Sequence, residues 1–217
     1  MGKVIYQRRG SISHIIMNST EKRNAVDEEF IHDMRNCFMK FNNDPKALVA
    51  IISSAGHHFS VGADLSLGIP SVEFAQHSLE MLPSIIGVMK PTIAVIEGYC
   101  LGGGWMIAQE CDIRVATYDC KFGIPEVKWN FVPPFCAGFI HQHLPPTICL
   151  ESMLTGNVIS GIKAYQIGFI NRVVDKESIM KKAMEIAEKM CGMRYVELIE
   201  RKKYFTDFLR NQKHGEH

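Results

Sequence analysis

The amino-acid sequence predicts an α/β protein whose sheet is mainly parallel. Short β-branched or apolar runs alternate with stretches of helical periodicity along most of the chain, which is the pattern of strands joined by crossover helices. Two of the apolar runs, 48–53 and 91–96, each give way to a turn that contains glycine. The 217 residues are 47% hydrophobic with a formal net charge of +1, so the chain can bury one sizeable core.

The N-terminal quarter reads as a hairpin followed by a helix and a strand. Two alternating runs, Val4–Arg8 and Ser11–Met17, flank Arg9-Gly10 and predict an antiparallel hairpin at a sheet edge. Asp27 is the predicted N-cap of a helix that continues to about residue 43, where Pro45 follows. Its apolar residues recur at three- and four-residue steps and predict a buried face: Phe30, Met34, Phe38 and Phe41.

A weaker helical pattern covers residues 71–88, and Pro83 should break or kink it.

The next stretch, 90–126, is the most informative in the chain. A strand to Ile96 is followed by Gly98, then by three consecutive glycines at 102–104, and a helical pattern begins at Trp105. Glycines permit close approach to a ligand, and the first N–H groups of a helix have no partner within it. Such a turn can hold a phosphate or a developing oxyanion.

Neither nucleotide-binding motif fits this glycine turn. A Walker loop needs Lys-Ser/Thr after its last glycine, where this chain has Trp105 and Met106, and a dinucleotide fingerprint needs spaced glycines. The turn could also serve only to pack a helix on a strand. A second glycine elbow, His57–Leu65, follows the strand 48–53, and two such elbows could aim two N–H groups at one oxygen.

The C-terminal part continues the alternation. Residues 131–137 predict an irregular segment, with an apolar helix following to about Leu144. Helices at 147–154 and 160–167, the latter capped by Ser160, precede a strand at 170–174 and a helix at 175–190. We expect residues 1–190 to form one core domain. Residues 191–217 are expected to add an amphipathic helix at 195–210 and a disordered polar end at 211–217.

Composition argues against several classes of partner. The 24 basic and 23 acidic residues are interspersed, which gives no support for nucleic-acid or membrane binding. Seven cysteines without a CxxC pair sit mostly in apolar runs and indicate reduced core thiols. With no apolar leader or membrane-length run, we expect a cytoplasmic protein. His141 and His143 have no accompanying acidic or cysteine cluster, so we expect no metal site.

Five segments together resemble the enoyl-CoA hydratase/isomerase (crotonase) family in order and spacing, over about residues 4–190. They are EKRNAV at 21–26, FSVGADL at 59–65, GYCLGGGW at 98–105, CDIRVAT at 111–117 and FGIPEV at 122–127. The resemblance implies a crotonase-like spiral of ββα units, with mainly parallel sheets, a small second sheet and a helical C-terminal region. It also implies an acyl-CoA thioester substrate, no cofactor apart from the coenzyme A of the substrate, and a homotrimer or dimer of trimers.

The resemblance implies an oxyanion hole and one acid/base residue. The backbone N–H groups of Ala63 and Gly103 would hold the thioester oxygen, and Gly62 and Gly102 precede them in the two elbows. Negative charge reaches that oxygen when a proton is removed next to the thioester, and preformed donors stabilise it. Glu126 would move the proton.

Further contacts are implied at the substrate-binding loops. Lys22 and Arg23 would approach the pantetheine and phosphates, although adjacent basic residues in a loop are often only solvated. Val61 and Ala63 would offer carbonyls to the adenine, and Asp64 reads as a side chain that stabilises the loop. Trp105 would either line the acyl end of the pocket or pack beneath it.

The sequence departs from the family in three places. Hydratases of this family have a glutamate two residues after the triple glycine, where this chain has Met106, and a small glycine where it has Pro134. Losing a neighbouring carboxylate makes the pocket drier and should raise the pKa of Glu126. Glu110, one turn beyond Met106, could act as a substitute acid or be a solvated or strand-capping carboxylate. Family members also continue for a few dozen residues past the last residue of this sequence, and those residues cover the acyl pocket. We therefore expect a more open pocket or a different subunit contact.

Three functional interpretations follow from these residues. The leading one is an enoyl-CoA hydratase/isomerase, in which one glutamate suits double-bond isomerisation and the family's commonest activity is hydration. The second is another enolate reaction, decarboxylation or thioester hydrolysis. The third is a non-catalytic subunit that binds acyl-CoA.

Overall fold

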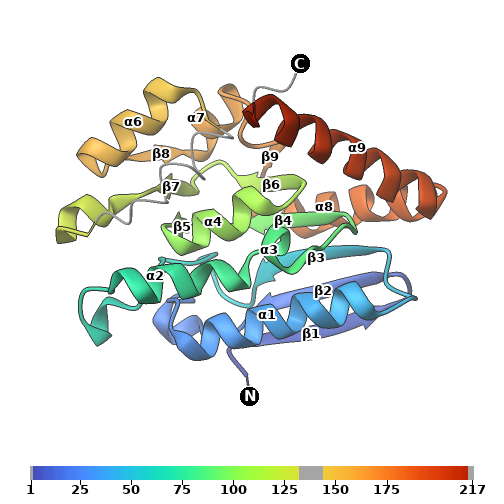
Figure 1. The fold of residues 1–217 in the computed structure, drawn as a ribbon, viewed down its shortest axis with the longest axis horizontal. Coiled ribbons are helices and arrows are strands. Elements are labelled where there is room, and N and C mark those ends of the chain that lie inside the picture. Colours follow the sequence, from blue (N-terminus) through green and yellow to red (C-terminus); the bar gives the residue numbers. More distant parts are fainter. Residues whose placement is uncertain (1, 132–143, 215–217) are drawn as a thin grey trace.

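A computed structural model describes residues 2–131 and 144–214. Its main layer is a six-stranded sheet in the order β1-β2-β3-β4-β6-β9 (Figure 1). The first two strands pair antiparallel as predicted, with Val4 opposite Met17, and every later pair is parallel. The strands are β1 Val4–Arg9, β2 Ile12–Met17, β3 Val49–Ser54, β4 Thr92–Ile96, β6 Ile113–Thr117 and β9 Arg172–Val174.

A second sheet of three short strands lies beside the first. It contains β5 Tyr99–Leu101, β7 Lys121–Gly123 and β8 Val158–Ser160 in that order, with β5 parallel to β7 and β8 antiparallel to it. None of these strands was predicted individually, because three residues are too few for a period-two pattern to be visible.

Two helices cover the two faces of the large sheet. Helix α1, Glu28–Asn43, is capped by Asp27, whose side chain accepts the Phe30 N–H at 3.0 Å, and its predicted apolar stripe is fully buried. Helix α8, Lys176–Cys191, packs against the other face through Ile179, Ala183 and Ala187. Because the central strands are buried on both faces, they read as continuous apolar runs.

Shorter elements surround the carboxyl ends of β3 and β4. Helix α4 begins at Gly103, two residues before the predicted start at Trp105, and ends at Glu110. As predicted, the helical stretch is broken at Pro83: Leu82 before it is extended, and Pro83 occupies the first turn of a new helix, where its missing N–H costs nothing. The remaining helices here are η1 Thr20–Lys22, η2 Leu65–Leu67, α2 Val72–Ser78, η3 Leu79–Met81, α3 Pro83–Ile86 and η4 Pro125–Trp129.

The C-terminal helices follow the predicted order. Helix α6 is Pro146–Thr155, and α7, Gly161–Gln166, is capped by Ser160, which accepts the Lys163 N–H at 3.2 Å. Helix α9 extends from Tyr195 to His214, so the expected disorder of the polar end was wrong for residues 211–214: the helical backbone continues through this polar sequence. Lys202 anchors α9 by donating to Asp112 Oδ2 at 2.8 Å and to the Lys90 carbonyl at 3.1 Å.

Several predictions fall on residues 132–143 and therefore lie outside the described residues. They include the irregular segment, most of the helix to Leu144, Pro134, and the His141 and His143 pair. Across the described ranges, none of the helices combines the length and apolar character needed to cross a membrane.

Candidate active site

The two glycine elbows meet at the end of the large sheet. Ser60 N–H donates to the Tyr99 carbonyl at 2.9 Å, and Leu101 N–H donates to the Ser60 carbonyl at 3.0 Å. Just beyond this pairing, a β-carbon built on Gly62 would lie only 3.4 Å from the Gly103 nitrogen. The elbows predicted from separate stretches of sequence are therefore in contact.

The peptide between Gly62 and Ala63 has a fixed orientation. Its carbonyl accepts the Val26 N–H at 2.8 Å, and Asp64 N–H donates to the Val26 carbonyl at 2.9 Å. In a trans peptide the N–H points opposite to the carbonyl, so the Ala63 N–H faces away from the Val26 main chain. Gly103 is the first residue of α4, and its N–H has no acceptor within the helix. Neither N–H has a hydrogen-bond partner among the described residues.

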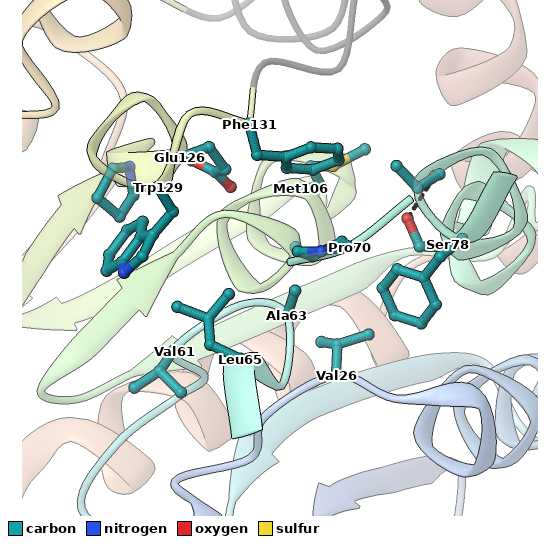
Figure 2. Close-up of a pocket in the computed structure, with 14 residues that line it drawn as sticks. Val26, Val61, Ala63, Leu65, Pro70, Ser78, Met106, Glu126, Trp129 and Phe131 are labelled. Atoms are coloured by element: carbon teal, nitrogen blue, oxygen red, sulfur yellow. Dashed lines mark hydrogen bonds between the residues drawn. The ribbon is translucent and has the colours of Figure 1, made fainter. Parts of the chain in front are cut away.

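Ala63 and Gly103 both line the same open cavity. Figure 2 shows Val61, Ala63 and Leu65 on one side of it, opposite Glu126, Met106 and Phe131. Within the described part of the chain, Glu126 is the one charged side chain in a lining that is otherwise mostly apolar. The full lining is Val26, Val61, Ala63, Leu65, Pro70, Phe74, Ala75, Ser78, Gly103, Met106, Pro125, Glu126, Trp129 and Phe131.

Glu126 is positioned by η4 and by Gly102. Its Oε2 atom is buried and has no hydrogen-bond partner in the described chain, while Oε1 lies against the Cα of Gly102. Burial raises the pKa of Glu126 from 4.5 to about 7, and a hydrogen bond to its own backbone opposes this only in part. At neutral pH the carboxyl can therefore both accept and return a proton.

Met106 stands at the position where the family resemblance would place a second glutamate. Its side chain lines the cavity and is only 5% exposed. Glu110, one turn further along α4, does not line the cavity; it accepts hydrogen bonds from the Ser84 N–H and side chain at the first turn of α3. Burial raises the pKa of Glu110 as well. Glu110 therefore does not reach the cavity as a substitute acid, and it caps the helix α3 and not a strand as predicted.

Lys22 and Asp64 form an ion pair in the loops beside the cavity. Lys22 Nζ donates to Asp64 Oδ2 at 2.7 Å, and the other Asp64 oxygen accepts the Ser66 N–H at 3.0 Å, which caps η2. Hydrogen bonds from Lys22 and Ser66 hold the pKa of Asp64 below its usual value. Asp64 thus stabilises the loop, as its sequence suggested.

Arg23 is exposed with a left-handed φ of 53°, and its carbonyl accepts the Val61 N–H at 3.2 Å. Neither Lys22 nor Arg23 is part of the cavity lining, so their expected contacts with coenzyme A stay predictions.

Trp105 does not line the cavity. It is 1% exposed, and its ring packs against Phe122 and Phe169 with centroid separations of 6.1 and 5.2 Å. The expectation that Trp105 contacts the acyl end is therefore wrong, and the alternative, packing beneath the site, is correct. Through the large Trp105 indole, helix α4 packs against the small sheet.

The part of the cavity wall that comes from α2 and the segment before it was not identified from the sequence. Phe74, Ala75 and Ser78 come from α2, and Pro70 and Leu65 from the loop before it. The weak helical periodicity of residues 71–88 was the one available signal, because a helix that lines a cavity presents apolar residues on more than its core face. The described ranges contain no cluster of three or more histidine, cysteine or acidic side chains arranged to hold a metal.

Comparison with known proteins shows the family to which the chain belongs. Residues 7–214 match the family described as enoyl-CoA hydratase/isomerase. The chain is 34% identical over 191 residues to the carnitinyl-CoA dehydratase of Proteus mirabilis, covering 85% of this chain and 72% of that protein. It is 35% identical over 190 residues to the carnitinyl-CoA dehydratase of Shigella flexneri, covering 84% and 72%.

Solved structures show the same fold. An enoyl-CoA hydratase/isomerase from Xanthobacter autotrophicus superposes with a TM-score of 0.89 at 26% identity, covering 98% of this chain and 81% of that one. A probable enoyl-CoA hydratase from Mycobacterium smegmatis superposes with a TM-score of 0.85 at 26% identity, covering all of this chain and 88% of that one. The protein has the crotonase fold and belongs to the enoyl-CoA hydratase/isomerase family.

Proposed function

We propose that the protein is an enoyl-CoA isomerase that moves a double bond along an acyl-CoA thioester. The thioester oxygen sits between the N–H groups of Ala63 and Gly103, and Glu126 moves the proton. Two N–H groups with no acceptor among the described residues and one carboxyl of raised pKa lie together in one apolar cavity, and they support this assignment.

The reaction needs one group that both takes and returns a proton. Ionised Glu126 removes a proton from C2 of a 3-enoyl-CoA. The electrons of the C–H bond form a C1–C2 double bond, and the carbonyl electrons move to the thioester oxygen. The resulting dienolate is stabilised by the two N–H donors, because they are already oriented and need no reorganisation. Protonated Glu126 then delivers the proton to C4, so that the double bond lies between C2 and C3. This gives the 2-enoyl-CoA and restores the carboxylate.

The choice of isomerisation rests on the single carboxyl, that of Glu126, in the lining that the structure describes. Hydration adds a water that two carboxylates would hold, whereas Met106 offers only a thioether at the second position. Residues 132–143 contain no aspartate or glutamate, so that segment supplies no second carboxyl.

The second candidate is dehydration of a 3-hydroxyacyl-CoA or its reverse, hydration. The names of the relatives favour it, since those at 34–35% identity are called carnitinyl-CoA dehydratases. In this chain Glu126 alone would have to take the C2 proton and return it to the departing hydroxyl group. The same enolate and the same oxyanion hole would be used.

Chromatographic assays of purified protein with a 3-enoyl-CoA and a 3-hydroxyacyl-CoA test the proposal. We expect the 3-enoyl-CoA to become the 2-enoyl-CoA, and Glu126→Gln to lower kcat by roughly 10²–10⁴-fold. Glu110→Gln is the matched control and should keep kcat, because Glu110 lies outside the cavity. If only the 3-hydroxyacyl-CoA is consumed, dehydration replaces isomerisation as the proposed reaction.

The expected homotrimer or dimer of trimers stays a prediction, which sedimentation velocity tests.

A further inference from the structure

Ser60 is the residue through which the two glycine elbows are joined. It is fully buried, and its main chain pairs with Tyr99 and Leu101 on the strand that leads to the second elbow. On the same side, its Cβ lies so close to Gly104 that a methyl built on Gly104 would approach it to 2.6 Å. Ser60 therefore contacts the first turn of α4, which carries Gly103.

The Ser60 hydroxyl also fixes the first elbow. Its Oγ donates to the Asn24 carbonyl at 2.7 Å and accepts the Gly62 N–H at 3.2 Å. Because the hydroxyl proton is committed to Asn24, a lone pair is left for Gly62. The Gly62 residue is thus held at both ends, by Ser60 at its N–H and by Val26 at its carbonyl. The next N–H along the chain is that of Ala63.

Asn24, whose carbonyl accepts the Ser60 hydrogen bond, is itself held rigidly. It is fully buried with a left-handed φ of 54°, a conformation that asparagine tolerates better than most residues. Its side-chain amide donates to Ser54 Oγ and to the carbonyls of His58 and Phe59 at 2.8–3.0 Å, and its oxygen accepts the Ser19 N–H at 2.9 Å. The carbonyl to which Ser60 donates therefore has little freedom to move.

We infer that Ser60 is a positioning residue that sets the spacing and direction of the Ala63 and Gly103 N–H groups. This inference rests on the proposed function, because it assumes that those two N–H groups hold the thioester oxygen. Without the hydroxyl, the Gly62 N–H and the Asn24 carbonyl are both buried and unpaired, and Gly62 is then held only through its carbonyl, by Val26. Small displacements of such donors have large kinetic effects.

The kinetic test compares Ser60→Ala with Ser13→Ala. Ser13 is also fully buried and also loses a hydroxyl hydrogen bond, to Tyr6 at 2.9 Å, but it lies on β2 away from the cavity. We expect Ser60→Ala to lower kcat roughly ten- to a hundredfold with a much smaller change in KM. Ser13→Ala should lower the melting temperature without this loss of kcat. Equal kcat in the two variants would overturn the inference.

A spectroscopic test separates this inference from the proposed function. Hexanoyl-CoA labelled with ¹³C at the thioester carbonyl is bound to Glu126→Gln, which cannot turn over. Hydrogen bonds to the oxygen polarise the carbonyl, so we expect a downfield shift on binding. Adding Ser60→Ala should reduce that shift, whereas adding Ser13→Ala should preserve it.

Each outcome has a distinct meaning. Absence of any shift in Glu126→Gln contradicts the oxyanion hole itself, and hence the proposed function. A shift that Ser60→Ala leaves unchanged contradicts only the role of Ser60. If Ser60→Ala does not fold, Ser60→Cys keeps a weaker donor and acceptor at the same place, and an intermediate shift is expected.

Discussion

The carboxyl group of Glu126 rests directly on the Cα of Gly102. A β-carbon at residue 102 would collide with Glu126 Oε1, and Gly102 itself has a left-handed φ of 49°. Its N–H donates to the Gly123 carbonyl at 3.0 Å, which ties the elbow to the strand that precedes η4. The elbow that presents the Gly103 N–H thus also contacts the carboxyl group of the acid/base residue.

Gly102→Ala should therefore disturb catalysis more than stability. The added methyl must displace Glu126, so we expect kcat to fall at least about 10²-fold, as for misplaced catalytic groups generally. Gly168→Ala is a matched control, because Gly168 has a left-handed φ of 81° but has nothing within 4 Å of the new methyl. Both variants should lose stability, by on the order of 1–3 kcal/mol for the strained backbone. Equal kcat in the two variants contradicts the contact with Glu126.

The activity should depend on pH through Glu126. Proton abstraction requires the ionised carboxyl, and burial raises its pKa to about 7. We expect kcat/KM for a 3-enoyl-CoA to rise about tenfold per pH unit below that value and to level off above it. Glu110→Gln should leave the profile unchanged, although the pKa of Glu110 is raised too. The profile is measured from initial rates. If kcat/KM is flat between pH 5 and 8, Glu126 is not the base.

Stability should depend on pH in the opposite direction. Between 4.5 and about 7 the folded protein keeps the Glu126 proton while the unfolded chain has lost it. The free energy of unfolding therefore decreases as pH rises through this window, by on the order of 2 kcal/mol. Urea denaturation of the wild type and Glu126→Gln at pH 5 and pH 8 measures it. The decrease should be smaller in Glu126→Gln, and identical decreases would show that Glu126 is not desolvated.

Restoring a second carboxyl should change the product. Met106→Glu places a carboxylate in the cavity lining beside Glu126, where the two groups can hold a water between them. We expect 3-hydroxyacyl-CoA to form from a 2-enoyl-CoA, and the protein to lose stability because Met106 is only 5% exposed. Met106→Gln, of similar shape and without charge, should form none. Hydration by the wild type at the rate of Met106→Glu would show that Met106 does not limit the reaction.

Much of the scaffold could be predicted from the sequence because its signals are local. The Asp27 cap, the buried stripe of α1 and the hairpin around Gly10 each follow from a few neighbouring residues. The elbows were also predictable, since Gly62 and Gly102 have the left-handed backbone that glycine permits.

Other features depend on partners that are distant in sequence. The small sheet has strands of three residues, which form only because they pair with each other. Glu110 and Met106 share a helix face, yet Ser84 on another element determines where Glu110 lies. The Ser60 contacts with Asn24, Gly62 and Gly104 likewise join segments that no local pattern connects.

Proton NMR in heavy water tests the central claim most directly, namely that Glu126 alone moves a proton along an enolate held by Ala63 and Gly103. A 3-enoyl-CoA is mixed with wild-type protein, and its C2 and C4 resonances are followed. We predict conversion to the 2-enoyl-CoA, with deuterium entering at C2 or C4, no 3-hydroxyacyl-CoA, and neither change with Glu126→Gln. Formation of 3-hydroxyacyl-CoA, or deuterium exchange that persists in Glu126→Gln, would contradict it.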